Sequence, residues 1–154
     1  MHYEISVTPF YDKKIIQGTV NMRFKVLKEG KTMQIDLQQP MEIMGAMTGN
    51  KSLKYTREGN VYFISLPDAF QVGSTQEIIF MYAGKPREAV NPPWDGGWIW
   101  KKDAKGRPWM SVACQGLGAS VWYPCKDYQG DEPDNGATIH ITVPDTLMAV
   151  ANGR

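Results

Sequence analysis

The sequence predicts an all-β fold: a single domain of saddle-like, sandwich-like antiparallel sheets. Two observations carry this prediction. Short segments alternate apolar with polar residues, the period of a half-buried strand. Turn-forming residues separate these segments about every 8 to 12 residues, as in sandwiches of antiparallel strands. No segment places apolar residues at helical spacing, and 154 residues suffice for one hydrophobic core.

The clearest strand is expected at residues 16–26, where Val20, Met22 and Phe24 alternate with polar residues. A turn at 28–31 followed by a new alternation at 33–37 predicts a hairpin. The polar turn at 102–107 predicts a second hairpin. Further strands are expected at residues 3–7, 43–47, 53–56, 61–66, 77–82, 98–100, 109–112, 137–143 and 147–151.

The last residues favour a tight turn, because Asn-Gly is the preferred pair of a type I′ hairpin. Only Arg154 follows Asn152 and Gly153 in this chain. We therefore expect a domain truncated at its C-terminal end, with a strand edge that another segment normally covers.

The charge balance argues against a nucleic-acid partner. Seventeen Lys and Arg residues stand against sixteen Asp and Glu, for a net charge of +1, so no strong field attracts a polyanion. Hydrophobic residues make up 42% of the chain. None of their runs approaches the roughly 20 residues of a membrane-spanning helix, so no membrane span is expected.

Residues 115–135 form the segment of greatest polar density, between one apolar strand and the next. Gln115 directly follows the first of these strands, which would hold its amide still. An amide oxygen can accept a hydrogen bond from a ligand's ammonium group, although an ordinary loop amide is the alternative. The acids of this segment favour turn and capping roles, with calcium as an alternative that matches no EF-hand spacing: Asp127, Asp131, Glu132 and Asp134.

No catalytic residue and no metal-ligand set is predicted. The two histidines do not form the His-Glu-x-x-His pattern of zinc peptidases, and no serine lies in a Gly-x-Ser-x-Gly turn. His140 is expected to be a surface or interface residue on a strand, and His2 is expected at a disordered terminus. Cys114 and Cys125 are expected to be buried thiols, or a single disulfide if the protein is exported.

All five tryptophans lie between residues 94 and 122. Packing in the core or at an interface is the expected role of each. A sugar-stacking platform is the alternative, which would make the chain a carbohydrate-binding module. The platform would use Trp94, Trp98, Trp100 or Trp109.

Several segments together resemble the N-terminal β domain of the zinc aminopeptidases in the aminopeptidase N and leukotriene hydrolase family. The Pro-Cys-x-Asp segment nine positions after a glutamine carries most of this resemblance, which spans nearly the whole chain. The matching residues are Gln115, Pro124-Cys125-Lys126-Asp127, Ala137-Thr138, Val143-Pro144 and Ala151-Asn152-Gly153, with Gly18, Ile35-Asp36-Leu37 and Tyr82-Ala83-Gly84 upstream.

The resemblance implies that residues 1–154 are an incomplete N-terminal β domain whose partner is its own catalytic domain. That catalytic domain, absent from this chain, would supply the zinc of a peptidase that removes N-terminal residues from peptides. Gln115 would help hold the substrate's free α-amine. Trp122, Tyr123 and Pro124 would shape or support the cleft wall, and Asp127 would fix the loop.

The chain departs from the family pattern in three places. Ser120 stands where many relatives have Arg, and residues 128–130 are an insertion before Asp131. The metal-binding helix is absent, so the chain alone is expected to have no peptidase activity. A purely structural interaction domain is the remaining alternative.

Overall fold

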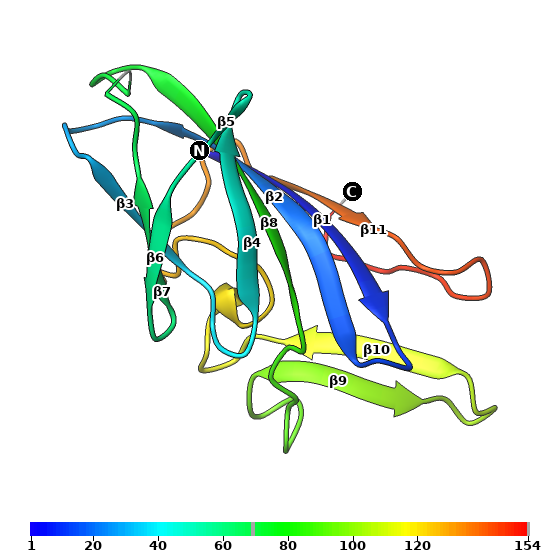
Figure 1. Cartoon of the computed structure of the whole chain (residues 1–154). Coiled ribbons are helices and arrows are strands. Elements are labelled where there is room, and N and C mark those ends of the chain that lie inside the picture. The colour runs from blue at the N-terminus through cyan, green and yellow to red at the C-terminus, as the bar shows by residue number, and fades with distance from the viewer. Residues whose placement is uncertain (69, 154) are drawn as a thin grey trace.

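The computed structural model describes residues 1–68 and 70–153 as an all-β domain with one short 3-10 helix (Figure 1). No helix in this described part is long and apolar enough to cross a membrane. The elements are β1 (His2–Phe10), β2 (Ile15–Lys25), β3 (Thr32–Asp36), β4 (Glu42–Thr48), β5 (Lys51–Ser52), β6 (Tyr55–Glu58), β7 (Val61–Ser65), β8 (Thr75–Gly84), β9 (Gly97–Lys102), β10 (Pro108–Ala113), η1 (Ala119–Val121) and β11 (Ala137–Ile141).

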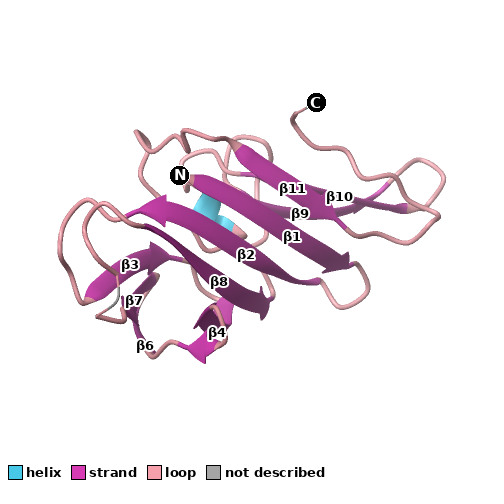
Figure 2. Cartoon of the chain, turned by 90° about the horizontal axis from the view of Figure 1, so that it is seen from above, coloured by secondary structure: helices cyan, strands magenta, loops and turns pink. Residues whose placement is uncertain are grey.

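The strands form three sheets. The largest has six strands in the order β11-β1-β2-β8-β4-β5, the second has the order β3-β7-β6, and β9 and β10 form a two-stranded hairpin. Figures 1 and 2 show the three-stranded sheet beside β4 and β8, and Figure 1 shows the hairpin beyond one end of the long strands. The all-β prediction is confirmed, and the hairpin predicted around 102–107 forms as β9 and β10.

The core fills the space between these sheets. The period-two pattern of β2 buries Ile16, Val20 and Met22 on one face. On β8 the same pattern buries Ile78, Phe80 and Tyr82. The second sheet and the hairpin contribute the opposite side of the core, with Ile35, Tyr62, Ile64, Trp98 and Trp100.

Two expectations from the sequence are wrong, namely one hairpin and one strand. Residues 16–26 and 33–37 do not form a hairpin, because both edges of β2 are occupied by β1 and β8, and β3 pairs with β7 in the other sheet. The paired strands are antiparallel as expected, except that β11 runs parallel to β1. Residues 147–151 form no strand: a turn closed by the Leu147 amide and the Pro144 carbonyl, 2.9 Å apart, takes the chain out of the sheet.

One strand boundary and one turn also differ. Of the strand expected at 53–56, only residues 55 and 56 lie in a strand, at the start of β6, while the buried Leu53 lies between β5 and β6. A type I′ turn requires positive φ at both of its central residues. Among the described residues, Lys14 is the only non-glycine residue with positive φ, so Asn152 does not have it. The type I′ turn expected at Asn152 and Gly153 therefore does not form. Arg154 lies outside the described residues.

Candidate functional site

Gln115 lies in a tight turn directly after β10. The Cys114 carbonyl closes this turn by accepting hydrogen bonds from the backbone amides of Leu117, at 3.1 Å, and Gly118, at 2.9 Å. The Gln115 side chain is exposed and forms no hydrogen bond with the described residues. Its backbone carbonyl packs against Gly96, where an added Cβ would come within 3.0 Å of the oxygen. The turn therefore presents a free amide group from a fixed backbone.

Gln38, in the connection between β3 and β4, anchors this turn. Its Nε2 donates to the Leu117 carbonyl at 2.6 Å and to Ser120 Oγ at 3.0 Å. Its backbone amide donates to the Ser120 carbonyl at 2.9 Å. Sequence reasoning missed Gln38, because it lies about 80 residues from the turn and no local pattern connects the two.

Asp127 braces the same segment from its other end. Its carboxylate accepts hydrogen bonds from the hydroxyl and the backbone amide of the buried Ser120. The amide of Asp127 in turn donates to the carboxylate of Asp36 at the end of β3, at 3.2 Å. Gly118 has φ +82 and lies against the Asp127 carboxylate, where no Cβ would fit. Asp127 therefore has an internal, loop-fixing role in this chain.

The Pro-Cys segment is attached directly to the second sheet. Asp36 and Cys125 exchange backbone hydrogen bonds of 2.8 and 3.1 Å. The Lys126 amide donates to the Tyr3 hydroxyl at 3.2 Å. Pro124 and Cys125 are buried. Their burial fits the supporting role that the resemblance implies.

Trp122 and Tyr123 are half-buried and connect the segment to the hairpin and to β1. Their rings meet edge to face with centroids 4.5 Å apart. Trp122 also packs on Trp98 of β9, and Tyr123 on Tyr3 of β1, at 6.3 and 6.4 Å. Such edge-to-face pairs stabilise packing beyond their buried area. In this chain both rings support the Gln115 turn, and a role in a cleft wall stays a prediction.

Two of the three acids predicted after Asp127 form ion pairs within the chain. Asp131 is 2.6 Å from the Lys126 ammonium, and Asp134 is 3.0 Å from the N-terminal ammonium. Glu132 is exposed. Among residues 1–68 and 70–153, no group of three His, Cys, Asp or Glu residues is arranged to hold a metal ion.

The histidines are placed differently from each other. His2 belongs to β1, where its ring contacts the Asn135 carbonyl at 3.0 Å, so the expectation of a disordered terminus is wrong. His140 is exposed on β11 as predicted, with Nε2 at 3.3 Å from Glu4.

Both cysteines are free thiols, with Cys125 buried and Cys114 half-buried. Burial raises the pKa of the Cys125 thiol, and the nearby Asp127 carboxylate adds to this rise. Burial also raises the pKa of the Cys114 thiol. A hydrogen bond with Trp122 lowers this pKa, but by less than burial raises it. Neither thiol is activated as a nucleophile, because a nucleophilic cysteine requires a lowered pKa.

These shifts predict a loss of stability in alkali. The folded chain keeps Cys125 protonated above its usual pKa of 9.0, and burial likewise raises the pKa of Tyr3 to about 12 and that of Tyr82 from its usual 10.0. The unfolded chain releases these protons first, so the stabilisation is complete below pH 9 and declines as the pH rises further. The slope is about 1.4 kcal/mol per pH unit for each such buried group.

Urea unfolding at pH 8, 9.5 and 10.5 measures this decline. A Cys125→Val variant should lose the part of the slope that begins near pH 9 and keep the part that begins near pH 10. A free energy of unfolding that stays constant up to pH 10.5 would contradict the assignment.

The tryptophans divide into two groups. Trp98 and Trp100 are buried in the core, so they cannot stack on a sugar, and that part of the platform expectation is wrong. Trp94 and Trp109 are 73% and 60% exposed. They belong to the loop before β9 and to β10 respectively.

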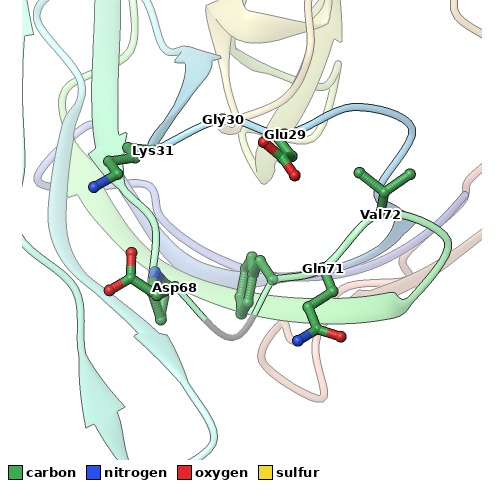
Figure 3. A pocket seen from close by; sticks show the side chains of 8 residues that line it. Glu29, Gly30, Lys31, Asp68, Gln71 and Val72 are labelled. Atoms are coloured by element: carbon green, nitrogen blue, oxygen red, sulfur yellow. The ribbon is translucent and has the colours of Figure 1, made fainter.

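One surface pocket lies away from Gln115. It has a volume of about 690 Å³ and lies between the turn after β2 and the connection from β7 to β8 (Figure 3). Lys31 and Asp68 lie on one side of it, with Glu29, Gln71 and Val72 around the rest of its rim (Figure 3). The rim therefore carries charges of both signs.

The fold matches solved zinc peptidases. The M1 zinc metallopeptidase from Deinococcus radiodurans superposes on 92% of this chain and 31% of its own, with TM-score 0.65 and 19% identity. The chain has the fold of one part of an M1 zinc metallopeptidase. A two-domain M1 zinc metallopeptidase mutant bound to L-arginine matches 100% of this chain and 36% of its own, with TM-score 0.66 and 18% identity.

A third structure, yeast LTA4 hydrolase in complex with bestatin, matches 94% of this chain and 23% of its own, with TM-score 0.69 and 12% identity. The chain thus spans between 23% and 36% of these three solved structures. No protein-family model matches the sequence, and a search of curated proteins finds no match. The M1 likeness is therefore one of fold, and it agrees with the resemblance found in the sequence.

Proposed function

We propose that this chain is the substrate-recognition and scaffold domain of a zinc-dependent aminopeptidase. The catalytic domain of the same protein, which holds the zinc, would be its partner. The single observation that carries this proposal is the exposed, otherwise unbonded Gln115 amide on a braced turn, within a fold that matches M1 zinc metallopeptidases over 92% or more of the chain.

Gln115 would accept a hydrogen bond from the α-ammonium of a peptide through its side-chain oxygen. The backbone of its turn is fixed by Gln38 and Asp127, so little ordering is needed when the ammonium arrives. Holding the first residue at this point sets the register of the peptide relative to the catalytic domain. In this proposal the zinc and the chemical step belong to the catalytic domain.

Gln115→Ala in the protein that carries the catalytic domain tests this proposal. A hydrogen bond to a charged group contributes about 1.5–3 kcal/mol, so we expect kcat/KM for free-amine peptides to fall roughly tenfold or more. Gln129→Ala, another exposed amide in the same segment, is the matched control. Unchanged kinetics for Gln115→Ala would instead favour a purely structural domain.

A further inference from the structure

Residues 87–98 form a closed loop that leads into β9. The Trp98 amide donates to the Arg87 carbonyl at 2.7 Å, and the Trp98 carbonyl accepts a hydrogen bond from the Ala89 amide at 3.0 Å. Gly97 has φ +145, and an added Cβ there would come within 2.6 Å of the Ala89 nitrogen. Only glycine fits such a close approach of two backbones. The two ends of the loop are therefore held against each other by backbone contacts.

Asp95 braces the loop between these ends. Its carboxylate oxygens accept hydrogen bonds from the backbone amides of Val90, at 2.8 Å, and Asn91, at 2.7 Å. The Arg87 guanidinium lies 3.8 Å from the same carboxylate. The hydrogen bond from the Val90 amide is the main cause that lowers the pKa of Asp95. Hydrogen bonds to a charged acceptor are stronger than neutral ones, so Asp95 fixes the shape of the loop.

The loop meets the Gln115 turn at Gly96. A Cβ at Gly96 would lie 2.8 Å from Leu117 Cδ1, 2.9 Å from its Cγ and 3.0 Å from the Gln115 carbonyl oxygen. An alanine there must therefore push the Leu117 side chain or the Gln115 carbonyl away. The Leu117 carbonyl also accepts a hydrogen bond from Gln38 at 2.6 Å. Leu117 thus connects the turn to two segments that are distant in the chain.

This contact bears on the position of the Gln115 amide group. Gly96 packs on the backbone of Gln115 itself, so a displacement of the loop moves the residue that carries the amide. A hydrogen bond weakens steeply when its angle departs from the preferred range. A misplacement of about 1 Å in a positioning contact can cost about a hundredfold in rate. Small shifts at Gly96 are therefore expected to change how well Gln115 holds an ammonium group.

We propose that Gly96 is a positioning residue for Gln115, and that Asp95 holds Gly96 in place. This inference rests on the proposed role of Gln115 in holding the substrate amine. It adds the loop of residues 87–98 as a support of that role. Neither residue contacts the peptide in this proposal, because both act through the Gln115 turn.

Gly96→Ala in the protein that carries the catalytic domain tests the inference. We expect kcat/KM for free-amine peptides to fall by about three- to tenfold, because the added methyl group displaces the turn. Gly30→Ala is the matched control. Its Cβ would meet only the Thr32 carbonyl oxygen, at an ordinary contact distance of 3.8 Å, so no change is expected.

A double variant distinguishes positioning from a general structural role. Gly96→Ala together with Gln115→Ala should have the same kcat/KM as Gln115→Ala alone, within about twofold, because the group that Gly96 positions is already absent. Losses that multiply in the double variant would show that Gly96 acts independently of Gln115, and would overturn the inference.

Asp95→Asn tests the brace without adding volume to the loop. An asparagine offers one acceptor oxygen where the carboxylate offers two, so one of the amides of Val90 and Asn91 loses its acceptor. We expect kcat/KM to fall about threefold, and this fall should also be absent when Gln115 is alanine.

Asp103→Asn is the matched control for this variant. The Asp103 carboxylate likewise accepts two backbone amides, from Lys105 at 2.8 Å and Arg107 at 2.9 Å, and pairs with an arginine. It lies in the turn between β9 and β10, whereas Gln115 follows the end of β10. Asp103→Asn should leave the kinetics unchanged. Equal losses from both variants would contradict the role assigned to Asp95.

The position of the turn is measured directly in the 154-residue chain. The Leu117 and Gly118 amides, which bond to the Cys114 carbonyl, should exchange their hydrogens at least about threefold faster in Gly96→Ala and in Asp95→Asn. Exchange in β2 and β8 should stay as it is. Unchanged exchange at both amides would overturn the inference.

The outcomes separate this inference from the function on which it rests. If Gln115→Ala weakens the capture of free-amine peptides and Gly96→Ala does not, Gln115 holds the amine and the positioning role of Gly96 is wrong. If Gln115→Ala changes nothing, the amine role fails. Exchange at Leu117 and Gly118 then decides separately whether Gly96 holds the turn.

Discussion

Gly18→Ala is expected to cost about 3 kcal/mol or more of unfolding free energy, because it places a methyl group inside a backbone contact. Gly18 lies in the middle of β2, opposite Val7 of β1 and Tyr82 of β8. A Cβ there would overlap the Ser6 carbonyl oxygen and approach the Tyr82 hydroxyl to 3.0 Å. Backbone atoms of two neighbouring strands cannot move aside without breaking the ladder.

Thermal unfolding of the isolated chain measures this effect. For a domain of this size the melting temperature should fall by roughly 10 °C. Gly45→Ala is the matched control, because its Cβ would meet only the flexible end of the Met81 side chain, at 2.5 Å. The control should change stability by less than about 1 kcal/mol. Equal effects of the two substitutions would show that the close approach at Gly18 does not limit stability.

Asp127→Ala is expected to release the Gln115 turn and to cost about 2–4 kcal/mol. It removes the acceptor for both the hydroxyl and the amide of Ser120, a residue that is 2% exposed. Buried donors without an acceptor are costly, and hydrogen bonds to a carboxylate are stronger than neutral ones. Gln38 would still donate hydrogen bonds to the carbonyl and the hydroxyl of Ser120. We therefore expect the turn to open locally before the whole domain unfolds.

Hydrogen exchange over residues 114–127 measures this release. Exchange should accelerate there and stay unchanged in β2 and β8. Glu132→Ala, an exposed acid of the same loop, should leave the pattern as it is. If exchange in the turn does not change in Asp127→Ala, then Asp127 is not the brace that its contacts indicate.

Most strands could be predicted from periodicity alone. The alternation in β2 is strong because one face of the strand is buried and the other is not, which is a local property of the sequence. The β9–β10 hairpin was equally predictable, since Gly106 supplies the positive φ that its turn requires. Prediction was weakest at 147–151, where an apolar run pairs with no strand among the described residues.

Only part of the candidate site could be predicted from the sequence. Gln115 could be singled out because a polar residue at the end of an apolar strand is held in place. The residues that hold its turn in place could not be predicted. The hydrogen bonds from Gln38 to Ser120 and from Asp127 to Asp36 join residues about 80 to 90 positions apart in the chain. The roles of Trp98 and Trp100 depended in the same way on which face of β9 meets the other sheets.

The amino-acid sequence by itself determined the all-β class, the position of most strands and the polar segment after β10, because these follow from side-chain periodicity and turn chemistry between near neighbours. Only the tertiary structure decided that β2 and β3 belong to different sheets and that β11 pairs in parallel with β1. Strand pairing joins residues that are distant in the chain, and its register depends on which apolar faces meet in the core.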